Sequence, residues 1–359
     1  AYGRERFRQK GAFDMTTAFA GTTAANVARS PAGRADKAAK ALGVLPEWDL
    51  THLYPAMDAP EFAADLEKAL AEARSFAALY RGKLAVLAAR ADASTVLAEA
   101  VAAYEKLEDL VGKIMSYAGL VYSGDTTDPQ RAKFYGDTQD KVTAISTELL
   151  FFGLELNRID EATLAKAAAQ APLSHWKPWI EDLAMDKPHQ LEDRIEELFH
   201  EKSVTGHGAW NRLFDETIAS LRFKAGGEEL TLELTLNRLQ DADGAVRKEA
   251  AEALGTVFRQ HLRTFGLITN TLAKDKEISD RWRKFEDVAD SRHLANRVER
   301  EVVDALVAAV RDAYPRLSHR YYKLKARWFG REALDYWDRN APLPRVEQRT
   351  IPWNEARDT

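Results

Sequence analysis

The 359-residue sequence contains no cysteine, which excludes disulfide bonds, thiol catalysis and thiolate ligands for a metal. This absence fits a reducing compartment, and we expect a cytoplasmic protein. Long apolar runs are also missing: none approaches the roughly 20 residues that a membrane helix needs, so we expect no membrane partner. The charges are nearly balanced, with 51 Lys and Arg against 56 Asp and Glu, and no block beyond the N-terminal tail is uniformly basic. This pattern disfavours a nucleic-acid partner.

Complete catalytic motifs are missing as well. The sequence has no G-x-G-x-x-G or Gly-Lys-Ser/Thr phosphate loop and no G-x-S-x-G elbow for a nucleophilic serine. The pair His200 and Glu201, followed by His207, comes nearest to a zinc motif, but an H-E-x-x-H helix needs its histidines four residues apart. Here the spacing is seven, and Gly206 and Gly208 beside the second histidine predict a break in the helix. We therefore assign no catalytic residue and no metal ligand.

Other polar residues have simpler structural interpretations. Three further histidines lack a companion at ligand spacing and are expected to have surface or hydrogen-bonded roles: His175, His189 and His261. Asp241 and Asp243 resemble the opening of a calcium loop, but the oxygen ligands that such a loop needs do not follow, so we expect a turn and a helix cap.

An acidic run and a tryptophan pair allow a similar comparison of alternatives. The acidic residues are interpreted as the solvated face of an amphipathic helix: Glu192, Asp193, Glu196 and Glu197. Trp176 and Trp179 offer a surface on which a ligand could stack, but the flanking Ile180 and Leu183 favour packing in a core.

What the sequence does contain is helical periodicity. Residues 1–37 lack an apolar face, so we expect a disordered tail, in which Met15 is a plausible true start. Residues 38–187 predict an N-terminal lobe built on three antiparallel helices, one of them capped by Asp128 with Pro129 in its first turn. Residues 188–359 continue with helices, including one that runs from about Gly244 through Leu272.

The one convincing strand signal lies in this second part. Alternating apolar residues on each side of Gly226 and Gly227, from Leu221 to Leu232, predict a small hairpin. The expected fold is therefore mostly α, with one small β-hairpin.

The stretch from Val302 to Leu343 contains an apolar helical pattern that requires a packing partner. Apolar residues recur there at mostly three- and four-residue steps, which places them on one stripe of a helix: Val302, Leu306, Val310, Leu317, Tyr321, Leu324 and Trp328. Pro315 is expected to kink or divide this helix. A stripe of this kind must face a partner.

Several short stretches, taken in order, resemble the oligoendopeptidase F family within the thimet-oligopeptidase-like zinc peptidases. They are WDLTHLY at 48–54, IMSYA at 114–118, DTTD at 125–128, KPHQL at 187–191, RWRKF at 281–285, YWD at 336–338 and APL at 341–343. None is diagnostic alone, and their order and spacing carry the resemblance.

The resemblance implies a mostly helical zinc peptidase that cleaves short, unfolded oligopeptides inside a deep channel. In this family two histidines of an H-E-x-x-H helix and a later glutamate hold the zinc ion, and none of these residues can be placed here. We therefore expect an N-terminal fragment, with the catalytic lobe truncated within residues 188–359. The fragment would supply channel walls and size exclusion, bind no catalytic zinc and be inactive alone.

The alternative is a non-enzymatic helical interaction or scaffold protein. It explains the missing chemistry without a truncation. Against it, residues 351–356 look like the start of a further helix, with Asn354 as its cap.

Overall fold

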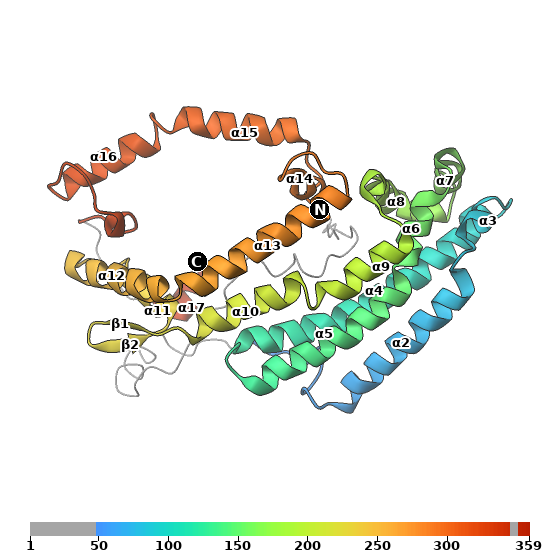
Figure 1. Ribbon diagram of the computed structural model, residues 1–359, viewed down its shortest axis with the longest axis horizontal. Helices are drawn as coiled ribbons and strands as arrows, with labels where there is room; N and C mark the ends of the chain where they lie inside the picture. The colour runs from blue at the N-terminus through green and yellow to red at the C-terminus, as the bar shows by residue number, and fades with distance from the viewer. Residues whose placement is uncertain (1–47, 345–350) are drawn as a thin grey trace.

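The computed structural model describes residues 48–344 and 351–359, which are mostly helical (Figure 1). The expected mostly α fold with one small hairpin is confirmed. The predicted disordered tail and Met15 lie outside the described residues. None of the described helices combines the length and the apolar composition that a membrane crossing requires.

Three long helices form the first part of the described chain: α2 (Pro60–Tyr80), α4 (Ala93–Gly124) and α5 (Pro129–Leu149). Helix α4 packs against both of the others, and successive members of the trio run in opposite directions (Figure 1). The predicted antiparallel arrangement is thus confirmed. The predicted start of α5 is also correct, because the Asp128 side chain accepts hydrogen bonds from the amides of Gln130 and Arg131.

Aromatic side chains tie the 48–54 stretch to these helices. The Tyr54 ring packs edge-on against Phe62 of α2 and Tyr117 of α4, with ring centroids 5.0 and 5.2 Å apart. Its hydroxyl donates to the Asp65 carboxylate at 2.7 Å, and the Lys113 ammonium donates to the same oxygen at 3.0 Å. Two stretches that carry the family resemblance therefore meet in one core.

Shorter helices close one end of this bundle: α3 (Leu84–Ala88), α6 (Phe151–Arg158), α7 (Glu161–Ala168), η1 (Leu173–Trp176) and α8 (Lys177–Ala184). Trp179 packs against the same core, stacked on Phe152 at 6.5 Å, and the Trp176 indole donates to Glu105 at 3.3 Å. Both tryptophans have protein partners, as the core-packing interpretation expected.

The second part of the chain contains the hairpin and the next group of helices: η2 (Lys187–His189), α9 (Asp193–Ser203), α10 (His207–Ser220), β1 (Phe223–Ala225), β2 (Glu228–Leu230), α11 (Leu232–Arg238), α12 (Gly244–Gln260), α13 (Leu262–Trp282) and α14 (Asp290–Ala295). The strands pair antiparallel, with Phe223 opposite Leu230. Gly226 and Gly227 both have positive φ, as a two-residue turn of this kind requires. The predicted hairpin extends too far at one end, because Leu232 already begins α11.

The single long helix predicted from Gly244 through Leu272 is wrong. The chain leaves helical geometry at His261, with φ −99° and ψ 6°, so α12 ends at Gln260 and α13 begins at Leu262. The apolar pattern continues across the break because both helices pack on the hairpin core, where Phe258 and Phe265 lie 6.0 Å apart between centroids. Periodicity alone therefore did not reveal the change of direction.

The last described helices are α15 (Arg300–Ala313), α16 (Ser318–Trp328), η3 (Tyr336–Asp338) and α17 (Trp353–Asp358). The predicted division at Pro315 is confirmed, since residues 314–317 form a turn. In Figure 1, α15 and α16 form an arch that stands away from α13 and returns toward α12. The predicted cap at Asn354 is wrong: the extended Pro352 precedes the first turn, and Asn354 lies inside it.

Candidate functional site

The histidines closest to a zinc motif lie on different helices. His200 belongs to α9, whereas His207 is the first residue of α10, and its Nδ1 lies 3.9 Å from the Asp275 carboxylate of α13. Within the part of the chain that the structure describes, no group of three His, Asp or Glu side chains could hold a metal ion. These residues do not fit the zinc ion that the family resemblance implies.

The glycines beside His207 have a steric role. A Cβ atom at Gly206 would lie 2.9 Å from the Lys202 carbonyl oxygen, and one at Gly208 would lie 2.9 Å from the Ser203 carbonyl oxygen. Only glycine permits this close approach between the start of α10 and the last turn of α9. The residues Asp241 and Asp243 also form local structure, because Asp243 caps α12 through the amide of Ala245 at 2.8 Å, as predicted.

Two stretches that carry the family resemblance, 187–191 and 281–285, meet at a junction between η2 and the end of α13. The His189 ring stacks on Phe285 with centroids 3.9 Å apart, and its Nδ1 hydrogen-bonds the Arg283 carbonyl oxygen at 2.8 Å. His189 therefore has the hydrogen-bonded structural role expected for it.

An ion pair with two parallel hydrogen bonds locks this junction. The Arg283 guanidinium donates to both carboxylate oxygens of Glu196, each at 2.7 Å, and Glu196 also accepts from the Leu191 amide at 2.8 Å. Glu196 is 8% exposed. The interpretation of the acidic run as a solvated face is thus wrong for Glu196, because its charge is paired with a residue 87 positions away.

The same junction encloses a pocket of about 230 Å³. It is lined by residues 188–192, Ile195 and residues 282–284. Gln190, one of the lining residues, is tied to the first group of helices, because its Nε2 donates to the Leu154 carbonyl oxygen at 3.0 Å.

A second set of ion pairs secures the same end of the molecule. Arg297 has a positive φ of 51° and donates to Asp182 of α8 at 2.6 Å and to Asp186 at 3.0 Å. These hydrogen bonds, first those to Asp186 and then those to Asp182, raise the pKa of Arg297 above its ordinary value. The turn after α14 is thereby fixed to the first group of helices.

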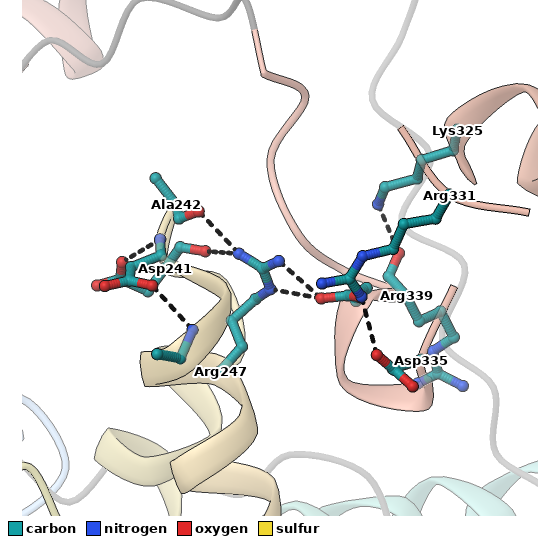
Figure 2. A network of polar contacts seen from close by, with 10 residues as sticks. Asp241, Ala242, Arg247, Lys325, Arg331, Asp335 and Arg339 are labelled. Atoms are coloured by element: carbon teal, nitrogen blue, oxygen red, sulfur yellow. Dashed lines mark hydrogen bonds and ion pairs between the residues drawn. The ribbon is translucent and has the colours of Figure 1, made fainter. Parts of the chain in front are cut away.

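A buried network holds the other end of the arch (Figure 2). Arg247 of α12 donates to the carbonyl oxygens of Asp241 and Ala242 at 2.7 and 2.9 Å, and its Nη2 donates to the Asp338 carboxylate of η3 at 2.6 Å. Arg247 is 2% exposed and Asp338 is fully buried. The second Asp338 oxygen accepts from Arg331 at 2.8 Å.

Lys325 belongs to the same network. Its ammonium donates to the Arg339 carbonyl oxygen at 2.8 Å, although the residue is only 2% exposed. Burial, and then the nearby charge of Arg247, lower the pKa of Lys325, and the Asp338 charge opposes that shift. The segment 336–343 is therefore held by charges contributed from α12, α16 and the loop after α16.

The buried partners of this network were missed from the sequence. Arg247 shares the buried face of α12 with Ala250, Ala251 and Leu254. An arginine at helical spacing from three apolar residues is the one local signal that could have indicated a buried ion pair.

Comparisons with known proteins agree with this fold. The family described as Oligopeptidase F matches residues 155–223. Group B oligopeptidase PepB of Streptococcus agalactiae serotype III (strain NEM316) is 26% identical over 321 residues, which cover 86% of this chain and 51% of the relative. The crystal structure of oligoendopeptidase-F from Enterococcus faecium matches with a TM-score of 0.69 at 21% identity, covering 79% of this chain and 56% of that chain.

The chain thus spans about half the length of the relatives that it matches. Its matching segments include the junction at 187–191, which lies within residues 155–223. The chain is therefore related, in sequence and in fold, to the oligoendopeptidase F family.

Proposed function

We propose that this chain supplies the helical, non-catalytic half of a zinc-dependent oligoendopeptidase that hydrolyses short, unfolded peptides. The observation that carries the proposal is the sequence similarity to an oligopeptidase over 86% of this chain. In the proposed role the helices wall one side of a channel, admit flexible oligopeptides and exclude folded proteins. Nucleic acid and membranes are not partners in this proposal.

The chemistry of the proposed reaction belongs to residues outside this sequence. Bound zinc would lower the pKa of a water molecule and stabilise the oxyanion of the tetrahedral intermediate. The described residues offer no ligand set for that ion, so no step of the hydrolysis is assigned to them.

The first test uses the 359-residue chain alone. Incubated with zinc and a short fluorogenic peptide, it should give no hydrolysis above the rate without protein. Hydrolysis that requires zinc and is abolished by a chelator would contradict the assignment of a non-catalytic half.

A scaffold or interaction protein is the second candidate, because α15 and α16 expose apolar side chains while no metal-binding group lies among the described residues. Determining the coding sequence around this chain's gene separates the two. An H-E-x-x-H helix and a later glutamate in the same reading frame support the peptidase, whereas a stop codon directly after Thr359 supports the scaffold.

A further inference from the structure

Helices α15 and α16 carry an apolar face that nothing in the described chain covers. We define the α15–α16 apolar face as the following seven residues: Val302, Leu306, Val310, Leu317, Tyr321, Leu324 and Trp328. Each is between 40% and 66% exposed, and α15 has no buried residue at all. Leu317 lies in the turn between the two helices, and the other six residues lie on them. A segment that exposes this many apolar side chains is typical of an interaction surface.

Polar contacts, and not packing of this face, hold the arch in place. At its start, Arg300 pairs with Asp290 and lies 3.7 Å from Asp287. At its end, Lys325 donates to the Arg339 carbonyl and Arg331 donates to Asp338. Both ends are therefore fixed, and the two helices between them stand apart from α12 and α13 (Figure 1).

A helix of this length needs packing to be stable. Isolated helices shorter than roughly 12–15 residues are marginal in water, and α15 has 14 residues. Most helix stability in proteins comes from burying an amphipathic face. The open face of α15 thus indicates that a partner surface completes it.

A row of positive charge borders the face along α16. Arg320, Lys323 and Arg327 each precede a residue of the apolar face by one position, so helical geometry places them in a single row beside it. None of the three forms an ion pair within residues 48–344 and 351–359, and residues 313–331 contain no Asp or Glu. A partner complementary to this edge presents an apolar stripe flanked by carboxylates.

We propose that the α15–α16 apolar face binds an acidic-edged amphipathic segment in the part of an oligopeptidase that this chain does not match. This inference rests on the proposed function. It is supported by the charge of the rim and by the coverage of the relatives, of which this chain matches 51% and 56%. The occupant is a polypeptide of that half and not a second copy of this chain.

The test measures binding of a complementary polypeptide from the organism that encodes this chain. We define this polypeptide as the oligopeptidase region that aligns with the half of PepB that this chain does not match. The full 359-residue chain is titrated with it by calorimetry. Leu306→Asp places a charge in the apolar face and should weaken binding at least tenfold. Ala308→Asp puts the same charge on the opposite side of the same helix and should change binding less than twofold. Circular dichroism checks that the two variants keep equal helix content.

The row of positive charge beside the α15–α16 apolar face allows a second, independent test. Reversing Arg320, Lys323 and Arg327 together to Glu should slow association and make the affinity less sensitive to salt, because rim charges act mainly through long-range attraction. Reversing Lys68, Arg74 and Lys133 together, which lie exposed on α2 and α5, is the charge-matched control and should change the association rate and the salt dependence far less.

Three outcomes overturn the inference: no binding by the unaltered chain, equal binding by the two aspartate variants, or self-association of this chain that Leu306→Asp abolishes. The proposed function is scored separately by peptide hydrolysis in the same mixture. If the mixture hydrolyses the peptide but both aspartate variants bind equally, the proposed function stands and binding through the α15–α16 apolar face is contradicted. If Leu306→Asp weakens binding but the mixture hydrolyses no peptide, binding through the face stands and the proposed function is contradicted.

Discussion

At the scale of single residues, buried charges join distant parts of the chain. Arg247 and Asp338 are 91 positions apart, yet both are almost completely buried and share two hydrogen bonds. Without Arg247, the buried Asp338 carboxylate would keep only the half-exposed Arg331 as its partner. The stability of the α12 region is therefore expected to depend strongly on this pair.

The variant Arg247→Met tests that dependence. It should lower the free energy of unfolding by about 1.5–3 kcal/mol, because Asp338 keeps its hydrogen bond from Arg331 but loses those from Arg247. Urea denaturation followed by circular dichroism measures the change. Arg316→Met, which removes an exposed pair with Asp312, is the matched control and should change little. Equal small effects of the two variants would show that the buried pair is not important for stability.

A pH dependence is expected at Asp65. Burial alone would raise the pKa of Asp65, but hydrogen bonds from Tyr54 and Lys113 outweigh it and hold the pKa below the ordinary 3.8. A carboxyl whose folded pKa is lowered stabilises the fold fully above the unfolded pKa, and that contribution disappears as the pH falls through the folded pKa.

The variant Asp65→Asn should therefore unfold at lower urea concentration than the unaltered chain at pH 7. The gap between the two midpoints should narrow as the pH falls below about 3.8, where the unfolded carboxyl also becomes protonated. A gap that stays constant from pH 7 to pH 3 would mean that the charge of Asp65 contributes nothing.

Polar contacts between residues close in the sequence could be predicted, whereas contacts between distant residues could not. The caps formed by Asp128 and Asp243 involve amides only two or three positions away, so the sequence alone indicated them. The pairing of Glu196 with Arg283 spans 87 positions and left no local trace. An acidic residue on a polar helix face looks solvated until the fold brings its partner to it.

At the scale of elements, the junction between η2, α9 and the end of α13 links the first helices to the second part of the chain. Glu196 and Arg283 form its central ion pair, and His189 stacks on Phe285 beside it. The variant Glu196→Gln should speed amide hydrogen exchange in residues 187–191 and 281–285, while exchange in α4 stays unchanged. The lost charge-assisted bonds are worth about 1.5–3 kcal/mol.

Glu197→Gln is the neighbouring control on α9 and should leave exchange at the junction as it is. Hydrogen exchange read by mass spectrometry resolves both segments. Equal exchange in the two variants would contradict a locking role for the Glu196 carboxylate.

Most elements followed from periodicity and turn residues, and the exceptions have physical reasons. The three long helices and the hairpin carry strong local signals, such as Pro129 and the Gly226 and Gly227 pair. The break at His261 does not, because the same apolar core covers both sides of it. The apolar residues of α15 and α16 were identified from the sequence, but only the structure shows that they are exposed.

At the scale of the whole molecule, several of the stretches that carry the family resemblance lie where distant segments meet. WDLTHLY packs on α2 and α4, KPHQL meets RWRKF, and YWD is held by α12. The family resemblance was stated from the order and spacing of these short stretches, whereas their contacts became visible only in the structure. The division at residue 187 and the truncated catalytic lobe remain predictions.

The most direct test of a non-catalytic half is reconstitution of activity. Equal amounts of the 359-residue chain and the complementary polypeptide are mixed with zinc, and hydrolysis of a short fluorogenic peptide is measured against each half alone. Activity should be gained only in the mixture, saturate at one-to-one stoichiometry and leave a folded protein substrate uncut. Zinc-dependent hydrolysis by the 359-residue chain alone, or a stable complex of the two halves without hydrolysis, would contradict the account.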